Sequence, residues 1–272
     1  MGHERVGTLP KTQKWRTLVS QIASLGGSGT DAVNGGTVSA AEVSDVAEQT
    51  VRNVSQQFRR AHLDAGVGAA FEYLVLLAAA GRSDDPRSVL SEHGVEVPDR
   101  PTALSFAKAG SSWLARNQDS LEYGQMARGA VSDTIGAWYR ANRPPQDRLF
   151  EPPENPFGVW RRAGDGAGFC ELARLFFASF TERHLNYYLE REASAVLPGL
   201  GARDEFGVQL NGHVEDISQH AFETARIAQS FAAGWFTNNT REGVPDREAI
   251  ARFLSIAFGK IRGELLREDP EG

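Results

Sequence analysis

The chain has 272 residues and a formal net charge of -6 at pH 7, with 41% hydrophobic and 24% charged residues. These proportions are ordinary for a globular protein and exclude the disordered and fibrous classes. The acidic balance argues against attraction of the whole surface to nucleic acid, because binding to phosphates depends on clustered Lys and Arg.

A single cysteine, Cys170, excludes an intramolecular disulfide and a thiolate metal cluster built from one chain. A reducing compartment is the simplest interpretation. Lys11, Lys14 and Arg16 interrupt the N-terminal segment, which lacks the continuous apolar core of a signal peptide. The longest apolar run, residues 73–80, is far shorter than the roughly twenty residues of a membrane span. We therefore expect a cytoplasmic protein with no membrane span.

The helical period recurs in nearly every segment, whereas no run alternates apolar and polar residues in the manner of a strand. The predicted fold class is therefore all-α: a single globular multi-helix bundle of about eight helices with a tethered N-terminal amphipathic helix. Residues 1–38 are predicted to hold that helix and a Gly-rich linker. Residues 39–272 are predicted to form the helical domain, with a Pro-rich loop at 143–168.

The first predicted helix spans about residues 10–25 and places five apolar side chains on one face, namely Trp15, Leu18, Val19, Ile22 and Leu25. The stretch 26–38 is rich in Gly, Ser and Asn, which is typical of a flexible linker. Ser39 followed by Glu42 forms a capping-box pattern that opens the second helix. The main body of the protein is predicted to begin there.

Residues 69–80 are apolar nearly all round, which predicts a buried central helix. A short helix should begin near Pro86 and end at Gly94. The helix at 101–117 is expected to place Leu104, Ala107 and Leu114 in the core. The next helix, 119–142, should turn the following side chains inward: Tyr123, Met126, Ala130, Thr134, Ile135 and Trp138.

Five prolines between residues 144 and 156 predict that the helical pattern stops from 143 to 168. A connection of this length is either functional or disordered, and its apolar anchors favour order. The helix at 169–195 is the most aromatic in the chain and is expected at the centre of the fold. A helix at 213–236 and a last one at 245–265 complete the bundle. The apolar stripe of the last helix consists of Ile250, Leu254, Ala257, Ile261 and Leu265.

Three histidines are the candidates for a metal site. His213 and His220 lie close to one side of a predicted helix, and His184 on the preceding helix approaches them if the two pack antiparallel. The chain contains no Glu-x-x-His or His-Glu-x-x-His motif. The plainer interpretation is that His213 caps the helix and His220 flanks its packing face. We predict no cofactor and no catalytic residue.

Arginines form the candidate surface for nucleic acid or small anions. Arg52, Arg59 and Arg60 share the second helix, although acidic residues on the same helix dilute their field. Arg161 and Arg162 precede a Gly-rich helix entry that is able to cradle an anion. A flexible helix entry is the simpler alternative.

The N-terminal helix is the most suggestive feature for binding a protein. An amphipathic helix with a Trp anchor fits the mode in which a helix docks in an apolar groove. Packing onto its own domain and lying on an anionic membrane are the alternatives. The predicted partner-binding residues are Trp15, Leu18 and Ile22 of this helix and Phe157 and Trp160 of the Pro-rich loop.

No nucleophile elbow and no phosphate-binding loop is present, and Cys170 fits a small buried hydrophobe better than a nucleophile. We therefore expect a non-enzymatic helical interaction or scaffold subunit of a bacterial multiprotein complex or homo-oligomer. A nucleic-acid-associated helical protein and a metal-dependent hydrolase using the His cluster are the two alternatives.

Overall fold

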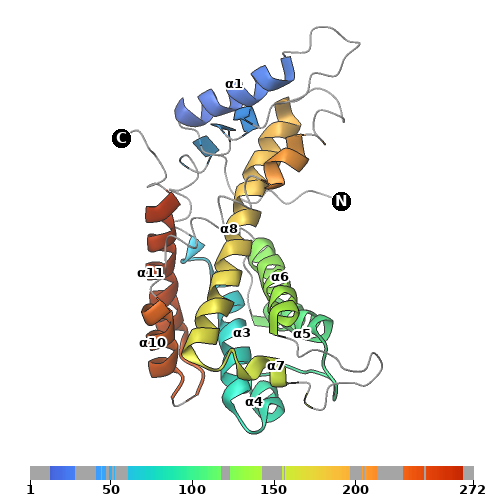
Figure 1. Cartoon of the computed structure of the whole chain (residues 1–272), viewed down its shortest axis with the longest axis vertical. Helices are drawn as coiled ribbons and strands as arrows, with labels where there is room; N and C mark the ends of the chain where they lie inside the picture. Colours follow the sequence, from blue (N-terminus) through green and yellow to red (C-terminus); the bar gives the residue numbers. More distant parts are fainter. Residues whose placement is uncertain are drawn as a thin grey trace. The chain divides into compact units, whose positions relative to one another are not determined.

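A computed structural model gives the fold of the chain (Figure 1). It describes residues 13–27, 41–43, 45–46, 49–50, 52, 61–117, 123–142, 155, 157–196, 204, 206–212, 229–241 and 243–265. These residues form helices, turns and loops and contain no strand. The all-α class predicted from the helical period is therefore confirmed.

Nine helices are delimited within the described residues. In chain order they are α1 (Gln13–Gly27), α3 (Ala65–Arg82), α4 (Pro86–Glu92), α5 (Ala103–Asn117), α6 (Gly124–Asn142), α7 (Gly158–Arg161), α8 (Gly166–Val196), α10 (Gln229–Asn239) and α11 (Arg247–Leu265).

The chain divides into two compact units, each made of separate segments. The first unit contains Met1–Arg60, Thr181–Ala225 and Ile261–Gly272, and the second contains Ala61–Phe180 and Arg226–Lys260. The first unit therefore holds residues on both sides of the domain boundary predicted near residue 38. The chain passes between the units at four places, of which one lies within α8 and another within α11.

Helix α3 is the buried helix of the second unit, as its apolar sequence predicts. Its residues from Phe71 to Ala80 are buried except for two of intermediate exposure, Glu72 and Ala79. The helix begins after Asp64, whose Oδ1 accepts hydrogen bonds from the amides of Gly66 at 2.7 Å and Val67 at 3.2 Å. Such an N-cap satisfies amides that the first helical turn otherwise leaves without a partner.

Aromatic rings surround Phe71 and form the core of the second unit. Phe71 stacks on Phe253 of α11 with ring centroids 5.1 Å apart and lies 5.5 Å from Phe177 of α8. Phe169 of α8 stacks on Phe236 of α10 at 4.2 Å. The aromatic residues of α8 in this unit, Phe169, Phe176, Phe177 and Phe180, are all buried. The predicted central position of this aromatic segment is thus confirmed for the second unit.

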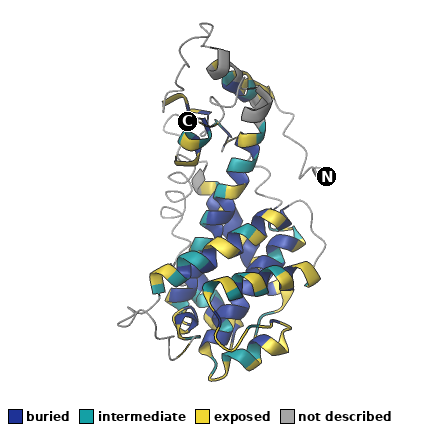
Figure 2. Cartoon of the chain, turned by 90° about the vertical axis from the view of Figure 1, so that its right-hand side faces the viewer, coloured by how far each residue is buried: buried dark blue, intermediate teal, exposed yellow. Residues whose placement is uncertain are grey.

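A second aromatic cluster joins α5, α6 and α7. Trp160 of α7 lies 5.4 Å from Phe106 of α5 and 6.5 Å from Trp138 of α6, measured between ring centroids. The indole of Trp138 donates a hydrogen bond to the carbonyl of Val159 at 3.0 Å. Figure 2 shows that helices of the chain have a buried face, drawn in dark blue, and an exposed face, drawn in yellow. Six inward positions predicted for residues 123–138 are buried.

Two glycines allow the neighbours of α3 to approach closely. A Cβ atom on Gly81 would lie 2.1 Å from the carbonyl oxygen of Trp160, and one on Gly110 would lie 2.6 Å from the ring of Tyr73. The Tyr73 hydroxyl donates a hydrogen bond to the carbonyl of Phe106 at 2.7 Å. Close packing of α7 and α5 against α3 therefore requires the absence of a side chain at both positions.

The predicted loop at 143–168 is wrong in its second half, because α7 and the first residues of α8 lie within it. The prolines end at Pro156, and the residues that follow bury Val159 and Trp160. Asp165 then caps α8 by accepting a hydrogen bond from the Gly168 amide at 2.6 Å. Residues 143–154 and 156 lie outside the described part of the chain.

The prediction that Leu104 belongs to the core is also wrong, since its side chain is 77% exposed. The buried face of α5 carries Phe106, Gly110, Trp113 and Leu114. Leu104 precedes Phe106 by two residues, which is a rotation of roughly 200° around the helix axis. Helix α5 packs against its neighbours through the face that carries Phe106 and Trp113, so the face that carries Leu104 is left exposed. In α11 the predicted stripe is buried from Ile250 to Ile261.

One described helix, α3, is long and apolar enough to cross a membrane by length and composition. However, 72% of that segment is buried inside the structure. Burial of this kind is typical of a core helix, so the hydropathy of α3 is explained by its central position in the second unit.

In the first unit the described residues include α1 and short helical stretches. Leu18 and Ile22 of α1 are fully buried, as are Phe206 and Leu210 of the stretch 206–212. Val43, Val46 and Thr50 are also buried. Two residues of the apolar face predicted for the N-terminal helix, Leu18 and Ile22, are therefore covered by other parts of the chain, and Val19 is half-buried.

Candidate functional site

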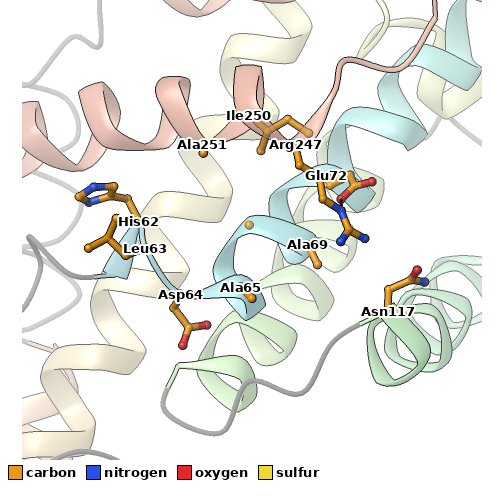
Figure 3. Close-up of a pocket in the computed structure, with 11 residues that line it drawn as sticks. His62, Leu63, Asp64, Ala65, Ala69, Glu72, Asn117, Arg247, Ile250 and Ala251 are labelled. Atoms are coloured by element: carbon orange, nitrogen blue, oxygen red, sulfur yellow. Dashed lines mark ion pairs between the residues drawn. The ribbon is translucent and has the colours of Figure 1, made fainter.

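A hollow of about 170 Å³ opens beside the start of α3 (Figure 3). We call it the α3 hollow, and it lies entirely within the second unit. Its lining residues are His62, Leu63, Asp64, Ala65, Gly68, Ala69, Glu72, Asn117, Arg247, Ile250 and Ala251.

The wall formed by α3 consists of small residues on a single helical face. Ala65, Gly68, Ala69 and Glu72 are spaced by three and four residues, which places them one above another on the helix surface. A Cβ atom on Gly68 would meet no other atom within 4 Å. The hollow exists because this face lacks bulky side chains where α3 lies near the start of α11.

An ion pair lies at one end of the hollow. Arg247 Nε of α11 is 3.3 Å from Glu72 Oε2 of α3, and the two side chains are 69% and 18% exposed, respectively. Burial raises the pKa of Glu72, and the charge of Arg247 opposes this effect without cancelling it. The carboxylate is therefore poorly solvated, whereas the guanidinium keeps most of its contact with water.

The other end of the hollow is formed by the turn that leads into α3. In Figure 3, His62 and Leu63 lie on this side, whereas Glu72 and Arg247 point toward each other at the opposite side. The Leu63 side chain is 75% exposed and adds an apolar group at the rim of the hollow. Asn117 of α5 also lines the hollow, and its Nδ2 donates a hydrogen bond to the Trp113 carbonyl at 2.8 Å.

The size and lining of the hollow suit binding of a single chemical group. Pockets for drug-sized ligands have volumes of roughly 300–1,000 Å³. The α3 hollow is smaller, with short apolar walls and one half-buried carboxylate. It is therefore matched to one side chain or a fragment of that size.

The structure places the predicted partner-binding residues mostly in the core. Leu18, Ile22 and Trp160 are buried, so their side chains are not available to a partner in this structure. Phe157 is half-buried and packs edge-on against Phe106. The Trp15 side chain lies outside the described residues. Four of the five predicted anchors, Leu18, Ile22, Phe157 and Trp160, thus pack at least partly within the chain itself.

The predicted arginine surface is described only in part. Arg52 and Arg161 are exposed, and Arg59 and Arg60 lie outside the described residues. Arg162 Nη2 donates to both carboxylate oxygens of Glu171, each at 2.8 Å. The Gly168 amide at the start of α8 already donates to Asp165. The chain's own carboxylates thus contact two of the groups predicted to receive an anion, Arg162 and the Gly168 amide.

The predicted histidine site is likewise described at one position only. His184 is fully buried with its ring 5.1 Å from that of Tyr188, and burial lowers its pKa to about 3. His213 and His220 lie outside the described residues, so the metal site stays a prediction. Among the residues that are described, no three His, Cys, Asp or Glu side chains gather in a metal-binding group.

Cys170 is buried in α8, and burial raises the pKa of its thiol. A buried thiol with a raised pKa is a poor nucleophile, because the thiolate is the reactive form. The expectation that Cys170 is buried as a small hydrophobe is confirmed.

Sequence patterns did not identify Glu72, Arg247 or Gly68 as site residues. One signal was present: Glu72 is the only charged residue between Ala65 and Gly81 in an otherwise apolar helix. A charge in such a segment needs a polar partner or access to water. Its partner, Arg247, is distant in the sequence and could be identified only from the structure.

Comparison of the chain with protein-family models, with curated proteins and with solved structures yielded no match. The α3 hollow, with its Glu72–Arg247 pair and the exposed Leu63, is the feature from which function is inferred.

Proposed function

We propose that this protein is a non-enzymatic interaction subunit that binds a partner protein by accepting one partner side chain in the α3 hollow. The observation that carries the proposal is the volume of about 170 Å³ next to a half-buried carboxylate. Protein interfaces commonly depend on a few anchor side chains that fill pockets of the facing surface. A hollow of side-chain size fits that mode.

The exposed Leu63 supports binding of a protein at this place. Its side chain lines the hollow and is 75% exposed. A partner that inserts an anchor into the hollow also covers Leu63, and burying a leucine stabilises a complex by about 1.5–3 kcal/mol at most. The buried core of a protein interface is more apolar than its rim, and Leu63 would contribute to such a core.

The burial of Glu72 provides a second, independent support. Because burial raises the pKa of this carboxyl, its ionised form lowers the stability of the free protein. Groups kept at the expense of stability are frequent at binding and catalytic sites. Binding of a partner gives a physical reason for a charge in the apolar surface of α3.

The test is a peptide-display selection on the full chain, followed by measurement of the affinity of the selected peptides for the wild type and for Gly68→Leu. Because a Cβ on Gly68 meets nothing within 4 Å, a leucine there fills the hollow without displacing backbone. Gly259→Leu is the matched control, since Gly259 is an exposed α11 residue with equally open surroundings and does not line the hollow.

We expect selected peptides to bind the wild type and Gly259→Leu equally, and to bind Gly68→Leu at least about tenfold more weakly, as for loss of an anchor contact. Both variants should remain folded, because replacing a helical glycine relieves a cost of roughly 0.5–1 kcal/mol. Peptides that bind all three proteins equally, or no enrichment at all, would contradict the proposal. Circular dichroism and thermal unfolding verify the fold of each variant.

A further inference from the structure

We infer that the side chain accepted by the α3 hollow is basic, the guanidinium of an arginine or the ammonium of a lysine, and that it pairs with Glu72. This inference rests on the proposed function and names the chemistry of the partner group. It follows from the charge, the contact geometry and the walls of the hollow.

The lining residues carry an excess of negative charge. Asp64 and Glu72 are carboxylates, and Arg247 is the only residue in the lining that is permanently cationic. A basic group entering the hollow therefore gains attraction, whereas an acidic group would meet a lining with more carboxylates than cations. Charge complementarity of this kind selects the sign of the partner's side chain.

Arg247 engages Glu72 only loosely. Its Nε lies 3.3 Å from Oε2, longer than the roughly 2.7–2.9 Å of a strong charge-assisted hydrogen bond. An ionised carboxylate has lone pairs on both oxygens. Glu72 therefore has acceptor positions beyond the one that faces Arg247 Nε, and these can receive a second donor.

Because the Glu72 carboxylate is desolvated, a further cation beside it would stabilise its ionised form. Burial raises the pKa of this carboxyl even with Arg247 beside it. A second positive group that excludes water stabilises the ionised form more strongly than a neutral donor does. An apolar side chain would instead remove water from the carboxylate and provide no donor in return.

The walls of the hollow match the aliphatic part of a long basic side chain. Ala65, Ala69, Ile250 and Ala251 present methyl and methylene groups between the turn at His62 and the pair at Glu72. Arginine and lysine bury their methylene stems against apolar surface while their charged ends reach a polar partner. A basic residue uses both parts of the hollow at once.

The experiment compares N-acetyl-arginine methylamide with N-acetyl-citrulline methylamide, which is nearly the same shape but neutral. Each probe is titrated into the full chain, and binding is followed by NMR shifts of labelled protein. An amino-acid-sized probe should bind with a Kd on the order of a millimolar. The citrulline probe should bind at least about tenfold more weakly, because it lacks the charge-assisted contact.

Three variants locate the interaction. Glu72→Gln should reduce binding of the arginine probe by about tenfold, to the level of the citrulline probe. Gly68→Leu should abolish binding, and Gly259→Leu should leave it unchanged. The citrulline probe should bind the wild type and Glu72→Gln with similar affinity, which separates loss of the charge contact from a damaged hollow.

Three results would each overturn the inference. They are equal affinity for the two probes, an unchanged affinity of Glu72→Gln for the arginine probe, and the absence of NMR shift changes at arginine-probe concentrations far above a millimolar. Peptides that depend on Gly68 but carry apolar or acidic anchors would also overturn it, while leaving the proposed function intact. Arginine binding that depends on Glu72, without any peptide that depends on Gly68, would support the basic-group site and overturn the proposed function.

Discussion

Glu72 and Arg247 form one ion pair, yet their burial differs enough that removing either has a distinct consequence. Glu72 is 18% exposed and Arg247 is 69% exposed. Desolvation therefore acts mainly on the carboxylate, and the arginine is the partner that reduces its cost.

We predict that Arg247→Gln lowers the free energy of unfolding at pH 7 by about 1 kcal/mol, because it leaves Glu72 half-buried without its cation. Glu72→Gln should raise it by a few tenths of a kcal/mol, since a neutral amide costs less to bury and the remaining arginine is solvated. Urea denaturation of both variants and the wild type measures the difference. The reverse order of stabilities would contradict this account of the pair.

Glu72 also sets a direction for the pH dependence. A carboxyl whose pKa is raised in the folded state contributes most to stability below the unfolded-state value, and this contribution falls as pH rises through the raised value. Glu72→Gln should therefore gain on the wild type as the pH increases from the acidic range toward neutrality. A constant difference between the two proteins would rule out a raised pKa at this position.

His184 predicts a pH dependence of the opposite direction. Burial lowers its pKa from 6.5 to about 3, so between these values the unfolded chain binds a proton that the folded chain does not. Stability due to the neutral imidazole is complete above the unfolded pKa and is lost as the pH falls below it, by up to about 1.4 kcal/mol per pH unit. In His184→Phe this component of the slope should disappear in urea titrations between neutral and mildly acidic pH.

An unchanged slope in His184→Phe would show that the histidine binds its proton equally in the folded and unfolded states, and would contradict the lowered pKa. Comparing slopes, not absolute stabilities, separates this effect from any change in packing beside Tyr188.

At the scale of helices, the glycines of α3 have opposite roles at its two ends. Gly68 faces open space at the hollow, whereas a Cβ at Gly81 would lie 2.1 Å from the Trp160 carbonyl. Both residues have an ordinary helical position, so the difference arises entirely from what packs against them.

We expect Gly81→Ala to lower the free energy of unfolding by about 1–3 kcal/mol, because backbone must move to admit the methyl group. Gly68→Ala should raise it by about 0.5–1 kcal/mol through the loss of glycine's conformational entropy. Thermal and urea unfolding measure both. A Gly81→Ala protein as stable as the wild type would mean that α7 is not packed as closely against α3 as the structure places it.

At the scale of the whole molecule, the N-terminal helix is part of a packed unit. Leu18 and Ile22 are fully buried, although the glycine-rich stretch after α1 suggested a free tether. The burial favours the alternative in which the helix packs onto its own chain.

A protein lacking residues 1–38 should therefore be less stable than the full chain. The double variant Leu18→Ala with Ile22→Ala should lose about 2–5 kcal/mol per site, the usual cost of truncating a buried aliphatic side chain. Thr17→Ala, an exposed position on the same helix, is the control. Size-exclusion chromatography with light scattering and urea unfolding measure the effect. An unchanged stability after the deletion would support the prediction that the N-terminal helix is a free, tethered segment.

Much of the helical architecture was predictable because it depends on local patterns. The 3.6-residue period predicted the all-α class, the apolar run at 69–80 predicted the buried α3, and the aromatic segment from Phe169 predicted the core helix α8. Each of these signals lies within one element, so no knowledge of its neighbours was needed.

The failures occurred where a residue's role depends on another element. Leu104 is as apolar as its buried neighbours, and only packing of α5 through Phe106 and Trp113 decides that it is exposed. Helix α7 was missed because its four residues are too few for a periodic signal, and its burial depends on Gly81 of α3.

The sequence by itself determined that the chain forms amphipathic and buried helices, because hydrophobic period and capping are properties of neighbouring residues. Only the tertiary structure decided which glycines permit close packing, which apolar anchors are buried, and that Glu72 meets Arg247 beside a hollow. Contacts between helices distant in the chain depend on the three-dimensional fit of side chains, and one helix alone does not encode that fit.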